Sequence, residues 1–236
     1  WNDQEQIEKG WLAGLPDLNQ DKPEVRKYLL DNTLWWIEQT GVDGMRLDTM
    51  RHISREFWTE FSKTIKEKHP DFYLLGEVWN SNPRYLELYH QTGIDGMINY
   101  SLYDGIVGTF TEFGTTSPLI NALAKESNFS NPEINGIFLD NHDNRRFMTA
   151  AGPNASKYLK QALTFIMTYK AIPIIYYGTE IAMEGGDDPD NRRFMEWEKV
   201  HDSEMLPFYK TLVDLRQNNE AIKSGDFKLL NYDNKF

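Results

Sequence analysis

The chain has 236 residues, enough for one large domain with a substantial core, and its composition is globular, with 40% hydrophobic and 26% charged residues. Its 25 Lys and Arg against 36 Asp and Glu give a formal net charge of −11, which disfavours a nucleic acid or an anionic membrane surface as partner. The absence of cysteine excludes disulfides and thiolate metal sites and fits either a cytoplasmic or a secreted protein, and no apolar run approaches the ~18–20 residues of a membrane span.

The first part of the chain predicts a helix followed by a strand. Asp21 can cap a helix that has Pro23 in its first turn and stops at Gly41. Trp35 and Trp36 lie within this helix and are expected to pack in the interior. Residues 42–48 then read as a strand.

A second helix and strand follow. Ser54 can cap a helix that runs to about His69, because Phe57, Phe61 and Ile65 recur at i, i+4 and i+8 on one face. Residues 72–77 form the next expected strand.

The remainder continues this alternation of apolar strands and helical segments. Helices are expected at 84–90, from about 103, briefly within 115–132, at 158–169 and at 204–218; strands are expected at 96–99, 136–140 and 172–177. A count that leaves out residues 42–48 gives four strands. With residues 42–48 the count is five. Both counts indicate a parallel α/β sheet, in a chain too short for eight βα units.

Carboxylates follow three of these strands. Asp48 ends Gly44-Met45-Arg46-Leu47-Asp48, Glu77 ends a similar run, and Asp143 closes Leu139-Asp140-Asn141-His142-Asp143. In a parallel barrel the carboxyl ends of the strands converge on one rim, where the active sites of that architecture lie. An enzyme is therefore the leading interpretation.

Two of these acids suit the cleavage of a glycosidic bond, which needs a proton donor and a carboxylate near the anomeric carbon. Asp48 and Glu77 end consecutive strands, and adjacent strands lie about 4.7–4.9 Å apart, close to the about 5–5.5 Å of retaining enzymes. Arg46 shares a strand face with Asp48 and would keep it ionised. Val78 and Trp79 give Glu77 an apolar surround, which favours the protonated form of a carboxyl group.

At this point the chain resembles the α-amylase family of glycoside hydrolases, whose catalytic domain is a (β/α)8 barrel, also called a TIM barrel. Residues 44–52 are similar to the strand-four motif, 76–79 to the strand-five motif and 138–144 to the strand-seven motif. Residues 15–19, 178–180 and 185–193, with Met195 and Trp197, resemble further family segments, the last of them in maltodextrin-acting bacterial members.

The resemblance implies roles for individual residues. Asp48 would be the nucleophile, Glu77 the acid/base and Asp143 the stabiliser of the transition state. The substrate-binding residues that it implies are Arg46, His142, Arg51, His52 and Trp79.

Simpler interpretations of these binding residues stay open. Arg46 could be a plain ion pair for Asp48, Arg51 and His52 could start the next helix, and Trp79 could belong to the core. No certain cofactor is implied. Calcium is a candidate, with His52 and Asn19 as possible ligands, although an amide is a weaker ligand than a carboxylate for this ion.

The resemblance also implies an incomplete barrel that contains strands four to eight only, because the motif that ends strand three does not occur in the chain. Residues 1–20 would end the inserted domain B, 21–223 would form the C-terminal part of the catalytic domain, and 224–236 would begin a C-terminal β domain. The expected partners are an oligosaccharide or polysaccharide substrate and either the missing N-terminal half of the barrel or a second copy, through open sheet edges.

The implied function is a retaining glycosidase that cleaves α-1,4-glucosidic bonds in starch, maltodextrin or cyclodextrin. Two alternatives stay open. One is an α-glucan transglycosylase with the same acids, and the other is a non-catalytic scaffold of the same fold, which would usually lack one or more of them.

We expect this chain by itself to have little or no activity, because strands and substrate contacts supplied elsewhere in the family would be absent. Hydrolysis of a chromogenic maltoside by the chain alone tests this expectation. Near-normal rates would show that the other strands are dispensable.

Overall fold

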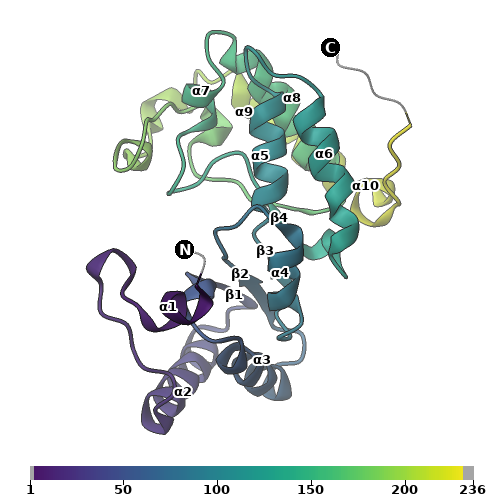
Figure 1. Ribbon diagram of the computed structural model, residues 1–236. Helices are drawn as coiled ribbons and strands as arrows, with labels where there is room; N and C mark the ends of the chain where they lie inside the picture. Colours follow the sequence, from purple (N-terminus) through teal and green to yellow (C-terminus); the bar gives the residue numbers. More distant parts are fainter. Residues whose placement is uncertain (1–2, 231–236) are drawn as a thin grey trace. The chain divides into compact units, whose positions relative to one another are not determined.

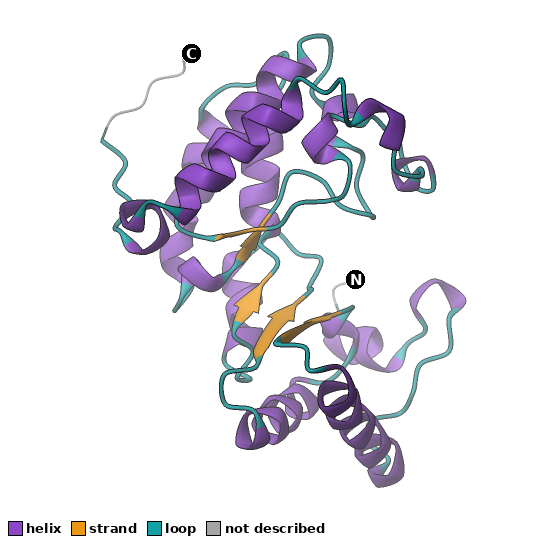
Figure 2. Cartoon of the chain, turned by 180° about the vertical axis from the view of Figure 1, so that it is seen from behind, coloured by secondary structure: helices purple, strands orange, loops and turns teal. Residues whose placement is uncertain are grey.

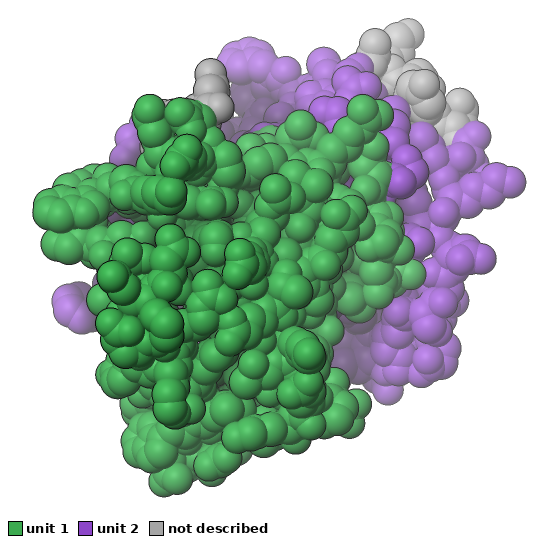
Figure 3. Space-filling model, turned by 60° about the horizontal axis from the view of Figure 1, so that its bottom comes forward, with its two compact units in different colours: residues 1–98, 128–135 green, residues 99–127, 136–236 purple. Residues whose placement is uncertain are grey.

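The computed structural model describes residues 3–230, which fall into two compact units. Of the described residues, the first unit comprises 3–98 and 128–135, and the second comprises 99–127 and 136–230 (Figure 3). Each unit has its own parallel sheet and its own hydrophobic core, and each is described by itself below.

The sheet of the first unit has three parallel strands in the order β1–β2–β3, drawn as arrows in Figure 2. Strand β1 spans Gly44–Leu47, β2 spans Tyr73–Gly76 and β3 spans Gly96–Met97. In the register of β1 and β2, Gly44 pairs with Tyr73 and Leu47 pairs with Gly76. Because the last residues of β1 and β2 are paired, the two strands end side by side.

Helices of this unit pack on the sheet through a shared core of buried Leu, Ile, Phe, Met and Trp side chains. Figure 1 shows α2 and α3 lying along the sheet. The helical elements are α1 (Gln4–Lys9), η1 (Leu12–Gly14), α2 (Pro23–Thr40), η2 (Met50–His52), α3 (Arg55–Lys68), α4 (Pro83–His90) and η4 (Pro132–Ile134).

The ends of α2 confirm one predicted signal and correct another. Gly41 adopts φ 63°, and its N–H donates to the carbonyl of Ile37 at 2.9 Å, so it ends the helix as predicted. Asp21 is not the N-cap, because Pro23 starts the helix and Lys22 stands at the cap position. The backbone N–H of Asp21 instead donates to the side-chain oxygen of Asn19 at 2.9 Å, in a turn that precedes the helix.

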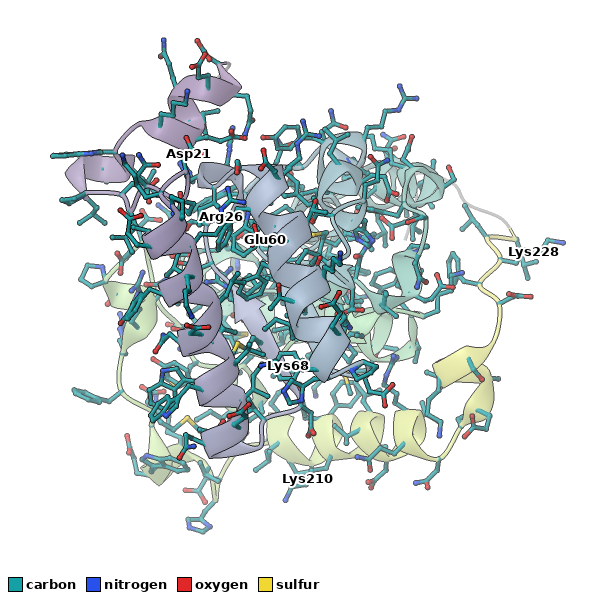
Figure 4. All side chains as sticks on the ribbon, turned by 90° about the horizontal axis from the view of Figure 1, so that it is seen from below. Asp21, Arg26, Glu60, Lys68, Lys210 and Lys228 are labelled. Carbon is teal, nitrogen blue, oxygen red and sulfur yellow. The ribbon has the colours of Figure 1, made fainter. Side chains whose placement is uncertain are left out.

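Arg26 joins α2 to α3. Arg26 Nη1 lies 2.6 Å from Glu60 Oε2, and both residues are labelled in Figure 4. The Arg26 guanidinium also lies over the ring of Phe57, at 5.8 Å from its centroid. Trp35 and Trp36 of α2 are 50% and 49% exposed, so the prediction that they pack in the interior is wrong. Their edge-to-face contact with each other leaves half of each ring in solvent.

Helix α3 forms as the sequence predicted. The Ser54 hydroxyl accepts the N–H of Phe57 at 3.2 Å, which satisfies one of the free donors of the first turn. Phe57, Phe61 and Ile65 are all buried in the core of the first unit.

The second unit is mostly helical, with strands β4 (Gly136–Ile137) and β5 (Ile172–Pro173) paired in parallel. Its core gathers buried side chains of α5, α6, α8 and α9. The helices are α5 (Tyr100–Thr109), α6 (Ser117–Lys125), α7 (Phe147–Ala150), α8 (Ala155–Thr168), α9 (Met205–Gln217) and α10 (Glu220–Ser224), with 3-10 turns η3 (Glu126–Asn128), η5 (Thr179–Ile181), η6 (Asp190–Arg192) and η7 (Trp197–Lys199).

All five predicted strand positions carry strands among residues 3–230, and each strand is shorter than expected. Two causes are visible. The Asn99 side chain accepts the N–H of Leu102 at 3.0 Å and caps α5, so β3 ends early and that helix begins three residues before Tyr103. In β5, Pro173 has no N–H to donate to the ladder.

The predicted C-terminal β domain at 224–236 begins within α10, and residues 225–230 contain no strand. Residues 231–236 lie outside the described part of the chain, so this domain boundary stays a prediction. None of the helices within residues 3–230 is long and apolar enough to cross a membrane.

Glu126 is a buried acid in the second unit. Its Oε1 accepts a hydrogen bond from Asn99 Nδ2 at 2.9 Å, and its Oε2 has no hydrogen-bond partner among the described residues. Burial raises the pKa of Glu126 to about 7, while the Asn99 bond and the charge of Lys170 oppose the shift. The folded chain therefore holds this proton more tightly than the unfolded chain does.

Because the folded pKa is raised, the stability from protonated Glu126 is full below its unfolded pKa and is lost as the pH rises towards 7. In the protein that carries this chain, we expect Glu126→Gln to raise the free energy of unfolding by about 1–3 kcal/mol at about pH 8 and hardly at all near pH 4.5. Urea unfolding at both pH values measures this, with the exposed Glu56→Gln as control. An effect equal at both pH values would contradict the assignment.

Candidate active site

The register of β1 and β2 places two acids next to each other. Asp48 directly follows Leu47 and Glu77 directly follows Gly76, the two residues that end the paired strands. The backbone N–H of Glu77 donates to the carbonyl of Leu47 at 2.8 Å, so the pairing continues into the acid itself. The predicted neighbourhood of Asp48 and Glu77 is therefore supported within the first unit.

Glu77 is 5% exposed, in surroundings that include the buried Val78. Its Oε2 accepts the backbone N–H of Thr49 at 3.0 Å, and its carbonyl accepts the N–H of Met50 at 2.9 Å. Thr49 has φ 48°, a left-handed conformation that is uncommon outside glycine. The two hydrogen bonds from this turn hold the carboxyl group and the backbone of Glu77 against the residues that follow Asp48.

Asp48 has the opposite environment. Its side chain is 66% exposed, and its Oδ1 forms an ion pair with Nη1 of Arg46, as the shared strand face predicted. The Arg46 side chain is itself partly buried, which makes it a better-defined partner than a fully solvated one. One acid is thus exposed beside a cation, and its neighbour is enclosed.

The other predicted residues of this unit lie around the same edge. Trp79 is 54% exposed, so it is not a core residue. Arg51 is 8% exposed; its Nη1 donates to the Trp79 carbonyl at 3.4 Å, and its guanidinium lies 5.8 Å from the ring centroid of Tyr85.

His52 ends the short η2 turn, and its Nδ1 lies 3.3 Å from the carbonyl oxygen of Ile7 on α1. Burial lowers the pKa of His52, so the neutral imidazole is favoured. Arg51 and His52 therefore sit in a turn that precedes α3, rather than in that helix.

The third acid belongs to the second unit. Asp143 lies in a turn after β4, where its N–H donates to Asn141 Oδ1 at 2.9 Å. Its Oδ2 lies 3.2 Å from His142 Nε2, and its Oδ1 lies 3.4 Å from Arg192 Nη2. Its side chain is 25% exposed. The approach of Asp143 to Asp48 and Glu77 stays a prediction.

Arg192 was not singled out from the sequence as a site residue, although the segment 185–193 was quoted for its resemblance. Its Nε donates to the His142 carbonyl at 2.9 Å, and it pairs with Asp188 at 2.8 Å. Residues 187–193 hold three Asp followed by two Arg, but a pairing across 49 residues cannot be deduced from this charge cluster.

A buried acid supports the turn that carries Asp143. Asp140 accepts the N–H of Phe147 at 2.9 Å and the hydroxyl of Thr179 at 2.8 Å. Burial raises the pKa of Asp140, whereas these two bonds and the charge of Arg146 act in the opposite direction. Asp140 therefore ties the end of β4 to the start of α7 and to η5.

Asn19 and His52 as calcium ligands stay a prediction. The Asn19 side-chain oxygen is engaged by the Asp21 N–H. Within residues 3–230, no group of three or more His, Asp or Glu side chains lies together in a way that could hold a metal.

A family model for the alpha amylase catalytic domain matches residues 1–205. A cyclomaltodextrinase of a Bacillus species is 36% identical over 221 residues, which make up 92% of this chain and 39% of that protein. The intracellular maltogenic amylase of Bacillus subtilis is 35% identical over 236 residues, which make up 96% of this chain and 39% of that protein.

Solved structures of α-amylases are also similar to this chain. An Anoxybacillus α-amylase matches with a TM-score of 0.94 and 43% identity, over 98% of this chain and 52% of its own. An α-amylase from Geobacillus thermoleovorans, complexed with acarbose, matches with a TM-score of 0.94 and 44% identity, over 99% of this chain and 53% of its own. The chain thus spans 39% of these curated relatives and about half of these solved chains.

Removing the hydroxyl that binds Asp140 should destabilise the protein. For Thr179→Val we expect a loss of about 1.5–3 kcal/mol in the free energy of unfolding, because the buried carboxyl group loses a donor. Thr164→Val is the matched control. Its hydroxyl bonds Lys160 on the exposed face of α8, and its loss should cost less than about 0.5 kcal/mol. Equal losses in the free energy of unfolding, measured with urea, would show that the Thr179–Asp140 hydrogen bond contributes no more than an exposed one.

Proposed function

Because this chain belongs to the α-amylase family of glycoside hydrolases, we propose that the protein that carries it is a retaining glycosidase of α-1,4-linked glucans such as starch, maltodextrin or cyclodextrin. Its fold is that of the family, a TIM barrel. The single observation that carries the proposal is the pairing of an exposed, cation-bound Asp48 with an enclosed Glu77 at the ends of neighbouring parallel strands.

The two acids would act in two steps. Glu77 would protonate the glycosidic oxygen while the Asp48 carboxylate attacks the anomeric carbon, so that the carbon–oxygen bond breaks and a glycosyl ester forms on Asp48. The Glu77 carboxylate would then take a proton from water, which attacks the same carbon and releases the sugar with its configuration retained. Asp143 would stabilise the positive charge that develops on the ring, with His142 beside it.

The environments support this division of roles. The ion pair with Arg46 restrains the Asp48 carboxylate, as the approach of a nucleophile to one carbon requires. The burial of Glu77 suits a group that must hold and release a proton. The exposed ring of Trp79, two residues after the acid, suits a stacking platform for a sugar. Arg51 and His52 are proposed contacts further along the substrate, and the bond from Arg51 to the Trp79 carbonyl also suits a role in holding that platform.

The finer assignment of the barrel belongs to the same proposal. We place β1 to β5 as strands four to eight, residues 1–20 at the end of domain B and residues 21–223 in the barrel. The coverage of about half of the solved chains agrees with this assignment. The substrate class follows the printed names of the relatives, which include a cyclomaltodextrinase and a maltogenic amylase.

In the complete enzyme, Glu77→Gln should lower kcat on maltoheptaose about 10²–10⁴-fold with little change in KM, because the amide cannot donate the proton. The matched control is Glu56→Gln on α3, whose side chain is 85% exposed. Steady-state kinetics of both variants give the comparison. A Glu77→Gln enzyme with wild-type turnover would end the assignment of Glu77.

Product analysis separates hydrolysis from transfer. Incubation of the complete enzyme with maltoheptaose should increase the number of reducing ends, since water accepts the glucosyl group. Disproportionated chains without new reducing ends would instead identify a transglycosylase that uses the same acids.

A further inference from the structure

The side chain of Asn191 holds the turn that carries Asp143. Its Nδ2 lies 2.8 Å from the carbonyl oxygen of His142, 2.9 Å from that of Asn144 and 3.4 Å from that of Asn141. Asn191 is fully buried, so this amide is shielded from competition with water. It binds the peptide groups on both sides of Asp143 and does not bind the Asp143 carboxylate.

Asn191 is itself held in place by Arg146, which is also fully buried. The Nε of Arg146 donates to the Asn191 carbonyl at 2.9 Å, its Nη1 donates to the Tyr177 carbonyl, and its backbone N–H donates to Gly185 at 3.1 Å. The guanidinium lies 3.9 Å from the ring centroid of Tyr176. Arg146 thus joins the segment 185–191 to the residues that follow β5.

Packing leaves this arrangement little freedom. A Cβ added to Gly185 would lie 2.8 Å from the Asn191 Cα and 2.9 Å from the Arg146 Cγ. Such a close approach of backbones requires glycine. Within the turn, Asn141 Oδ1 accepts both the Asp143 N–H at 2.9 Å and the Asn144 Nδ2 at 2.7 Å. The peptides around Asp143 are therefore fixed from inside the turn and from the Asn191 amide.

We propose that Asn191 is a positioning residue that sets the direction of the Asp143 side chain through the His142 and Asn144 carbonyls. This inference rests on the proposed function, in which Asp143 stabilises the transition state. Arg192 differs from Asn191 because its charged side chain reaches the Asp143 carboxylate itself. The Asn191 amide is neutral, so its effect on the reaction is one of geometry alone.

A geometric role predicts a particular kinetic signature. If the Asp143 carboxylate moves away from the position it takes in the transition state, kcat falls while KM for the ground state changes little. A displacement of about 1 Å can cost about 10²-fold in rate. We expect Asn191→Ala to lower kcat on an activated-leaving-group maltoside about 10- to 100-fold, with KM within about threefold of wild type.

The experiment uses the complete enzyme and corrects every rate for the folded fraction, measured by circular dichroism. Asn191→Ser keeps a single donor, is the second variant should Asn191→Ala fold poorly, and should show a smaller loss. Asp187→Asn is the matched control: it removes the exposed Arg145–Asp187 ion pair, which links the same two segments outside the turn, and should leave kcat within about twofold.

A double-mutant cycle with Asp143→Asn distinguishes positioning from folding. If Asn191 acts through Asp143, the Asn191 substitutions should have little further effect on the residual kcat of Asp143→Asn, and this result supports the inference. An equal fold-loss in both backgrounds, or wild-type kcat in the Asn191 variants, overturns it.

Asp48→Asn in otherwise wild-type enzyme serves as the test of the proposed function. If Asp48→Asn abolishes hydrolysis while the Asn191 variants keep full kcat, only the positioning role fails. If the enzyme shows no hydrolysis that depends on Asp48, the proposed function fails and the inference fails with it.

Discussion

The parallel pairing of β1 with β2 is the constraint on which the proposed chemistry of the first unit depends. Because Leu47 and Gly76 are register partners, Asp48 and Glu77, which follow them, lie at the same end of the two strands. A slip of one residue would send one of the two acids to the opposite face of the sheet, since side chains alternate along a strand. The hydrogen bonds of the Thr49 turn to Glu77 then add a local restraint to the one that the sheet provides.

The two acids acquire different properties from their surroundings although both are carboxyl groups at strand ends. Asp48 faces solvent beside Arg46, whereas Glu77 is 5% exposed and bonded to the turn after Asp48. A pair of acids in such contrasting environments is the arrangement that double-displacement hydrolysis of a glycoside requires.

In the second unit the site residues are held differently, since His142 and Asp143 lie in a turn rather than at the end of a paired strand. A turn has no ladder of its own to keep it rigid, so its backbone groups must find partners elsewhere. Here the Asn191 amide, from the segment 185–193, binds the His142 and Asn144 carbonyls. Asp140 binds the Phe147 N–H at the start of α7, which follows the turn. These polar groups are buried among the second unit's core, where a hydrogen bond lost to one partner is not replaced by water.

The sequence by itself determined the alternation of helices and strands, the Ser54 and Gly41 helix signals, the Arg46–Asp48 pair and the membership of the family, because each depends on residues close together in the chain. Tertiary structure decided the rest. Trp35 and Trp36 stayed about half exposed, and Asn191 and Arg192 met the Asp143 turn across about 50 residues of chain. Contacts at that separation depend on how the core packs, and no local spacing of residue types encodes them.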